Sequence, residues 1–232
     1  MTAPDRSPLQ DIDQRPARER VYAYVREQIL RGAILGGSFV EEEAISRVMG
    51  VSRTPVREAF HRLAAEKFID LLPRRGALVR QVTAQELADL YETRRMIEGY
   101  AIARICREKI PAIDQMRPIL DELDRAAEHD HFPRVELNRA FHFAMVAAVG
   151  NEVLSELYQS LGSRQQRVAM RAIAVSPDRI ARIREEHHAL MAALTAYDEA
   201  EARAVLDRHL FPVLGVVSRL PGYAAIAGGI AG

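Results

Sequence analysis

One stretch, Gly50–Phe60, constrains the fold of this chain more than any other, because it places a helix start directly behind a glycine turn. Gly50 suits the left-handed residue that ends a helix. Ser52 or Thr54 can cap the helix that follows, and Pro55 is tolerated in its first turn, where a missing N–H costs nothing. The stretch therefore predicts two helices joined by a tight turn.

Arg53 and Arg57 lie four residues apart and therefore share one face of the second helix. They project from its opening turns, where the positive end of the helix dipole favours phosphate. A helix that reads DNA needs donors for phosphates and guanine edges at its N-terminal end. The pattern predicts a recognition helix in a DNA-binding chain.

The charge distribution supports this interpretation, although the net charge of the 232 residues is zero. Residues 17–80 carry 12 Lys and Arg against 8 Asp and Glu, whereas residues 81–232 carry 18 against 21. The basic excess is local, as expected if one segment meets DNA and the rest does not.

The flanking sequence predicts a winged helix-turn-helix domain over residues 17–81, after a disordered, proline-containing tail at 1–16. Its helices are expected at about 18–31, 41–49 and 52–67, and two short strands at 68–72 and 77–80. The strands flank Pro73-Arg74-Arg75-Gly76, a basic hairpin tip that can lie on a phosphate backbone or enter a minor groove. A solvated turn is the alternative for this tip.

From Val82 onward the pattern is helical, and Thr83-Ala84-Gln85-Glu86 forms a capping box at the start of a long helix. Further helices are expected at about 112–128, 134–149, 151–173, 177–195 and 199–218. The fold class is thus mainly α, with a six-helix antiparallel bundle over 82–220 that can enclose a pocket. Residues 221–232 are uncharged and rich in Ala and Gly, and we expect a flexible tail there.

Four polar side chains of the helical half have spacings that can bring them together. Asn138 and His142 are four residues apart on one helix, and His187 and His209 each lie eleven residues from Asp198, the expected turn of a helix hairpin. Three imidazoles and an amide form a plausible site for a divalent transition metal. Core histidines that only satisfy hydrogen bonds are the alternative. The other four histidines are expected at the surface or in loops: His61, His129, His131 and His188.

The compartment is expected to be the cytoplasm. The single cysteine, Cys106, excludes an internal disulfide and falls in an apolar helical pattern. No apolar run reaches membrane-spanning length, and the N-terminus lacks the apolar segment of a signal peptide.

With these residues in view, the chain resembles the GntR family of transcriptional regulators over roughly residues 17–215. The stretch Gly50–Phe60, followed by Leu63 and Gly76, is similar to the DNA-binding domain of that family. The helical half resembles the FCD ligand-binding domain of the same family, in the motifs Glu92-Thr93-Arg94-Arg95-Met96-Ile97-Glu98, Phe141-His142, Gly150-Asn151, Glu186-His187 and His209-Leu210.

The resemblance implies a homodimer that binds double-stranded DNA at a pseudo-palindromic operator. It also implies a small organic acid effector, held through a divalent metal such as zinc, nickel or manganese. The implied operator contacts are Ser52, Arg53, Thr54, Arg57, Arg75 and Gly76, and the implied metal ligands are Asn138, His142, His187 and His209. Arg94 is the candidate for the effector carboxylate, and an internal ion pair with Glu98 is the alternative.

Three positions depart from the family pattern. Asn138 stands where aspartate is more usual, so the metal charge would be less compensated and an anionic effector more strongly attracted. Lys67 and Tyr197 stand where glycine is usual. A left-handed Tyr197 would cost on the order of 1 kcal/mol, which is too little to change the fold.

The sequence therefore predicts a regulator, more readily a repressor than an activator, whose operator affinity is set by an effector. Two rivals remain. One is a small metalloenzyme with Glu186 as a base beside a histidine-bound metal. It leaves Arg53 and Arg57 without a role and requires Glu186 to face the metal beside His187. The other is a DNA-binding protein whose helical half only dimerises.

Overall fold

The computed structural model describes residues 15–73, 75–126, 130–176, 179–212 and 214–225. The chain divides between Gln81 and Val82 into two compact units. No helix in these ranges is long and apolar enough to cross a membrane.

Three helices form the body of the N-terminal unit: α2 (Ala17–Leu30), α3 (Glu42–Met49) and α4 (Arg53–Ala65). Gly50 ends α3 in the left-handed conformation with φ 63°, as the sequence predicted. Ser52 occupies the cap position of α4, although its side chain makes no capping hydrogen bond. Val56, Phe60 and Leu63 of α4 are buried and hold the helix against α2.

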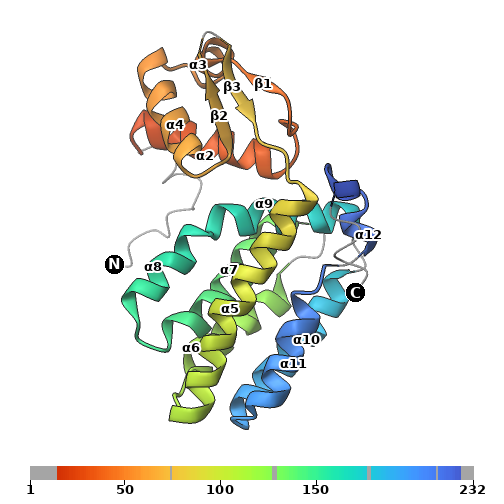
Figure 1. Ribbon diagram of the computed structural model, residues 1–232. Coiled ribbons are helices and arrows are strands. Elements are labelled where there is room, and N and C mark those ends of the chain that lie inside the picture. The colour runs from red at the N-terminus through yellow and green to blue at the C-terminus, as the bar shows by residue number, and fades with distance from the viewer. Residues whose placement is uncertain (1–14, 74, 127–129, 177–178, 213, 226–232) are drawn as a thin grey trace, which may run out of the picture. The chain divides into compact units, whose positions relative to one another are not determined.

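A three-stranded antiparallel sheet completes the winged helix-turn-helix unit. Its strands β1 (Phe39–Val40), β2 (Ile69–Leu72) and β3 (Gly76–Val79) lie in the order β1-β3-β2, with Ile69 opposite Val79. Strand β1 was not predicted from the sequence, because two residues are too short for an alternating pattern to be visible. Figure 1 shows the sheet beside the three helices of this unit.

The C-terminal unit is entirely helical over its described residues (Figure 1). Its helices are α5 (Ala84–Glu108), α6 (Ile113–Arg125), α7 (His131–Ala147), α8 (Glu152–Ser160), α9 (Gly162–Val175), α10 (Arg179–Thr195), α11 (Glu199–His209) and α12 (Leu214–Val217). They surround one core, in which Ile102, Ile105, Met116, Met145 and Leu194 are fully buried. Helix α6 packs on α7, and α10 packs on α11.

The expectation of six helices was wrong in two places. The helix expected over 151–173 is divided at Leu161, where the N–H bonds back only three residues, to the Tyr158 carbonyl at 3.1 Å, and Gly162 begins α9. The helix expected over 199–218 ends at His209, because Pro212 disfavours helical backbone at the residue before it. Eight helices, α5 to α12, therefore occupy the described part of this unit.

Predicted caps and turns shape the ends of these helices. Thr83 accepts the Glu86 N–H at 3.1 Å, and Asp198 accepts the Glu201 N–H at 3.0 Å. Tyr197 has a φ of 53°, and Lys67 has a φ of 65°, so both occupy the left-handed region that favours glycine.

The expected terminal tails lie mostly outside the described residues. Of residues 221–232, only 221–225 are described. Within them the Pro221 carbonyl accepts the Ala84 N–H at 3.0 Å, and Tyr223 packs against the core. The beginning of this segment is thus bound to the N-terminal end of α5.

Candidate functional site

Three histidines meet in the core of the C-terminal unit. His142 lies on α7, His187 on α10 and His209 at the end of α11, and their side chains are buried. One ring nitrogen from each lies within 4.8 Å of the others. The hairpin of α10 and α11 brings His187 and His209 side by side, with ring centroids 4.9 Å apart, as the equal spacing from Asp198 predicted.

A buried carboxylate orients the first imidazole. His142 Nδ1 donates to Glu98 Oε2 at 2.8 Å, and Arg94 Nε and the Tyr158 hydroxyl donate to Glu98 Oε1 at 2.7 and 2.6 Å. Although burial alone would raise it, Arg94 and His142 hold the pKa of Glu98 well below its usual range. Because an ionised carboxylate can only accept, the hydrogen of His142 is on Nδ1, and Nε2 presents a lone pair.

Glu186 orients a second imidazole in the same way. His209 Nδ1 donates to Glu186 Oε2 at 2.9 Å, and Arg182 Nε donates to Glu186 Oε1 at 2.9 Å. Burial raises the pKa of Glu186, but the bonds from His209 and Arg182 outweigh it, so the net shift is downward. His209 therefore also presents Nε2 as a lone pair. Glu186 is occupied as an orienting group and does not face the cluster as a free base.

The third imidazole completes the cluster. His187 Nε2 lies 3.2 Å from His142 Nε2, and its own Nδ1 has no hydrogen-bond partner among the described residues. Burial lowers the pKa of all three histidines, that of His142 to about 4 despite Glu98. All three are thus neutral at pH 7, which is the form that binds metal.

These residues fit a transition metal. Tetrahedral coordination with metal–nitrogen distances of about 2.0 Å places neighbouring nitrogens roughly 3.3 Å apart, close to the 3.2 Å between His142 and His187. In histidine metal sites, the ring nitrogen that does not bind the metal usually donates to a carboxylate, as His142 and His209 do here. The cluster of three buried histidines can therefore hold a metal ion.

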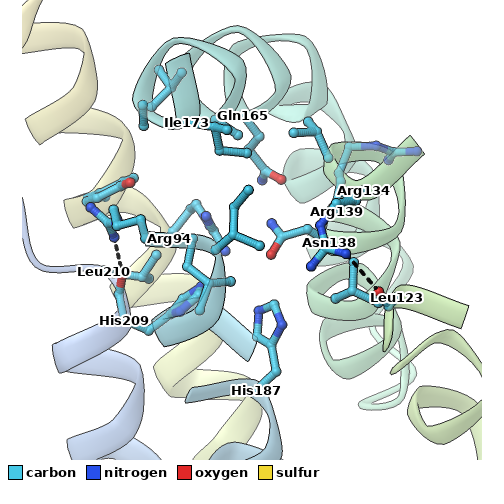
Figure 2. Close-up of a pocket in the computed structure, with 18 of the residues that line it drawn as sticks. Arg94, Leu123, Arg134, Asn138, Arg139, Gln165, Ile173, His187, His209 and Leu210 are labelled. Atoms are coloured by element: carbon cyan, nitrogen blue, oxygen red, sulfur yellow. Dashed lines mark hydrogen bonds between the residues drawn. The ribbon is translucent and has the colours of Figure 1, made fainter. Parts of the chain in front are cut away.

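A cavity of about 70 Å³ adjoins the cluster, large enough for roughly five waters. His187 and His209 lie on one side of it (Figure 2), and Asn138 and Arg94 also line it. Asn138 lies one helical turn before His142 on α7 and is partly buried. The cavity therefore adjoins the predicted ligand set.

Arg94 makes the internal ion pair with Glu98 that was the alternative interpretation, and it has one further donor at the cavity. Its Nε is bonded to Glu98, which is the internal ion pair, while its Nη2 is buried without a hydrogen-bond partner in the described residues. Only 6% of Arg94 is exposed. Because an unsatisfied guanidinium nitrogen in a core is costly, this donor is suited to an anion in the cavity.

The candidate DNA-reading residues lie on the exposed side of α4. Arg53 and Arg57 are exposed in its first two turns, as are Ser52 and Thr54. In the absence of DNA, Arg53 is paired with Glu43 of α3 at 2.7 Å. Arg57 is paired with Glu42 of the same helix, also at 2.7 Å. Glu43 and Glu42 are therefore bound to the two guanidinium groups that are predicted to contact DNA phosphates.

The predicted wing is the turn between β2 and β3. Arg75 is exposed, and its N–H bonds to the Leu72 carbonyl at 3.1 Å. Gly76 has a φ of 88°, and a Cβ there would lie 3.2 Å from the Val40 carbonyl, so the position requires glycine. Arg74 lies outside the described residues.

Family comparisons agree with this geometry. The profile of the FCD domain matches residues 89–211, and that of the bacterial regulatory proteins of the gntR family matches residues 17–79. The chain belongs to the GntR family and carries an FCD domain. This GntR-family chain is therefore a DNA-binding transcriptional regulator and not an enzyme.

Curated relatives include several repressors. The HTH-type transcriptional repressor GlaR of Escherichia coli (strain K12) is 26% identical over 82% of this chain and 93% of its own length. The probable D-xylose utilization operon transcriptional repressor of Paenarthrobacter nicotinovorans is 28% identical over 94% of this chain and 95% of its own length. The Nta operon transcriptional regulator of Aminobacter aminovorans is 33% identical over 55% of this chain, but the match covers only 61% of that relative.

Solved structures share the fold of this regulator. The E. coli protein McbR/YncC has a TM-score of 0.66 at 24% identity, over 85% of this chain and 94% of its own. A putative GntR regulator from Rhodococcus sp. RHA1 has a TM-score of 0.69 at 23% identity, over 91% of this chain and 97% of its own. At these identities the likeness concerns the fold alone.

The groups that orient the histidines and several that line the cavity were not predicted from the sequence. Glu98 was considered only as a partner of Arg94, and Glu186 only as a base. A signal existed for Glu98, since an acidic residue on the apolar face of a long helix requires a buried partner. For Gln165, Arg134 and Arg139, which also line the cavity, the sequence offered no signal.

Proposed function

We propose that this regulator is a repressor that binds its operator as a homodimer and releases it when a small carboxylate enters the FCD domain. The observation that carries the proposal is the cluster of three neutral, buried imidazoles beside a cavity lined by Arg94, whose Nη2 has no hydrogen bond to any described residue. The similarity to GlaR, a repressor, and to the probable repressor of a D-xylose utilization operon favours repression over activation.

The operator contacts are assigned to the first turns of α4 and to the wing. Exposure of Arg53 and Arg57 beside the positive end of the helix dipole supports contacts to phosphates and guanine edges in a major groove. The left-handed Gly76 lets the wing turn tightly enough to approach a minor groove. The proposed contact residues are Ser52, Arg53, Thr54, Arg57, Arg75 and Gly76.

The proposed metal ligands are His142, His187 and His209, with Asn138 as a fourth. When bound, zinc, nickel or manganese would supply a positive point of attachment for an effector carboxylate. The protein's part is to keep the imidazoles neutral by burial and to aim them through Glu98 and Glu186. Arg94 would bind the same carboxylate through its Nη2, which has no hydrogen-bond partner among the described residues.

Effector binding would act on the arrangement of the two DNA-binding units of a dimer. A differential affinity worth about 1–3 kcal/mol between the operator-bound and free forms is sufficient for such a switch. Two-fold symmetry of the dimer predicts a pseudo-palindromic operator. As a regulator of bacterial DNA, the protein would work in the cytoplasm.

The test measures fluorescence anisotropy of the purified protein on DNA from the region flanking its gene. We expect specific binding, released by a small carboxylic acid only when metal is present and restored by a chelator. Equal operator affinity under all of these conditions would support the rival in which the helical domain only dimerises. Absence of specific binding to any flanking fragment would argue against the operator assignment.

A further inference from the structure

The far side of the cavity carries a second group of donors. Figure 2 shows Gln165 of α9 projecting into the cavity from the side opposite His187. Gln165 is 6% exposed, and its Nε2 is buried without a hydrogen-bond partner among the described residues. Arg139 of α7 lies against the start of α9, where a Cβ on Gly162 would come 3.5 Å from its Cδ, and its Nε is likewise buried without a hydrogen bond to the described residues. Two donors without a hydrogen bond to the described residues therefore lie beside α9, although Arg139 Nε is within 3.7 Å of the Glu136 carboxylate.

The charges around the cavity are also unbalanced. Five arginines and no carboxylate are among its described lining residues. Three of the five have carboxylates behind them: Arg94 with Glu98 at 2.7 Å, Arg184 with Asp124 at 2.8 Å, and Arg139 with Glu136 at 3.7 Å.

The other two arginines bond only to backbone carbonyls within the described residues. Arg134 donates to the carbonyls of Leu123 and Ala126 at 3.4 and 3.0 Å, and Arg179 donates to that of His209 at 3.3 Å. Within the part of the chain that the structure describes, neither of these two guanidinium groups has a carboxylate partner. Because uncompensated charge in a poorly solvated site is costly, the cavity favours a ligand with more than one negative charge.

The wall between the two ends is apolar. Helices α9 and α10 line it with aliphatic side chains: Val168, Ala172, Ile173, Ile180 and Ile183. Such a wall suits methylene groups, and the cavity volume of about 70 Å³ suits a compact molecule.

We propose that the effector is a compact linear dicarboxylate bound at both ends. One carboxylate lies between Arg94 and the histidine cluster, and the other accepts from Gln165 and Arg139. This inference rests on the proposed effector function of the FCD domain and adds the charge of the effector and a second anion subsite to it.

The experiment is calorimetric titration of the metal-loaded, full-length protein with acids of equal chain length. The pairs are succinate with butyrate, glutarate with pentanoate, and adipate with hexanoate. The second carboxylate of a diacid would accept charge-assisted hydrogen bonds that a monoacid lacks. We therefore expect at least one diacid to bind about tenfold to a hundredfold more tightly than the monoacid of equal length.

The variants Gln165→Leu and Arg139→Gln locate the second subsite. We expect each to lower diacid affinity towards that of the monoacid while leaving monoacid affinity and metal content unchanged. Arg171→Gln, an exposed position on the same helix as Gln165, is the matched control and should keep the full preference. Thermal melting checks that each variant is folded.

Three results would overturn the inference. Equal affinity for monoacids and diacids would refute the second subsite while leaving the carboxylate-controlled regulator intact. A diacid preference that persists in both variants would refute its location. Absence of binding by every acid would remove the proposed effector function together with the inference.

Discussion

His142 donates from Nδ1 to Glu98 at 2.8 Å in the centre of the FCD domain, and neither side chain is exposed. The same carboxylate neutralises Arg94, so one buried charge contacts both the histidine cluster and an arginine that lines the cavity. The two proposed ligand sites are therefore joined through Glu98.

Replacing this carboxylate should destabilise the fold. Glu98→Gln leaves the Arg94 guanidinium buried without its counter-charge, and loss of one partner of a buried pair costs about 3–5 kcal/mol. Urea denaturation should show the free energy of unfolding fall by about that amount. A change below about 1 kcal/mol would mean that water, and not Glu98, compensates Arg94.

Glu186→Gln should weaken metal binding with little effect on the fold, since Glu186 lies at the edge of the cluster and orients only His209. Loss of a carboxylate behind a histidine ligand costs about tenfold to a hundredfold in metal affinity. Competition with a colorimetric chelator measures this. The neighbouring exposed Glu185→Gln is the control and should bind metal as the unaltered protein does.

His187→Ala should abolish stoichiometric metal and the response to chelator. If free metal stands at about 100 times its Kd, binding stabilises the protein by about 2.7 kcal/mol, which a chelator removes. Thermal melting with and without chelator, together with elemental analysis, tests both effects. His188→Ala changes an exposed neighbour and should retain metal. Full metal content in His187→Ala would refute the site.

Arg53→Ala and Arg57→Ala should each lose specific operator binding while the dimer persists. Each substitution removes a cation that would contact a DNA phosphate. The slope of the logarithm of the binding constant against the logarithm of the salt concentration should therefore fall in magnitude by about one. Anisotropy titrations over a salt series, with sedimentation to check the dimer, provide the measurement. Normal operator affinity in either variant would contradict the assignment of α4 as the recognition helix.

The acidic partners of these arginines should restrain binding to arbitrary DNA. Glu42→Gln and Glu43→Gln free Arg57 and Arg53 from pairs of 2.7 Å each. Affinity for a duplex of unrelated sequence should rise by roughly threefold in low salt, and the gain should vanish at high salt. Glu58→Gln, an exposed position on α4 itself, is a comparison that leaves both pairs intact. No gain in either variant would show that the pairs do not compete with phosphate.

Local chemistry made much of the fold predictable. Gly50 ends a helix, and Thr83 and Asp198 each cap the start of one. Each acts only on neighbouring residues, so each was recognisable in the sequence without knowledge of the packing. The divided helix at Leu161 was missed because the backbone there stays close to helical, with φ −79° and ψ −12°. Pro212 was a visible stop signal that the periodic pattern around it obscured.

By itself, the sequence determined the winged helix and the helix face that Arg53 and Arg57 share. It also determined that His187 and His209 lie side by side across their helix hairpin, because helical spacing and the position of the turn at Asp198 are local properties. The tertiary structure decided what surrounds them. Burial keeps the imidazoles neutral, and Glu98 and Glu186 determine which nitrogen His142 and His209 present. Gln165 faces the cavity only because α9 packs beside α7. These properties depend on distances between helices far apart in the chain, and no local pattern encodes such distances.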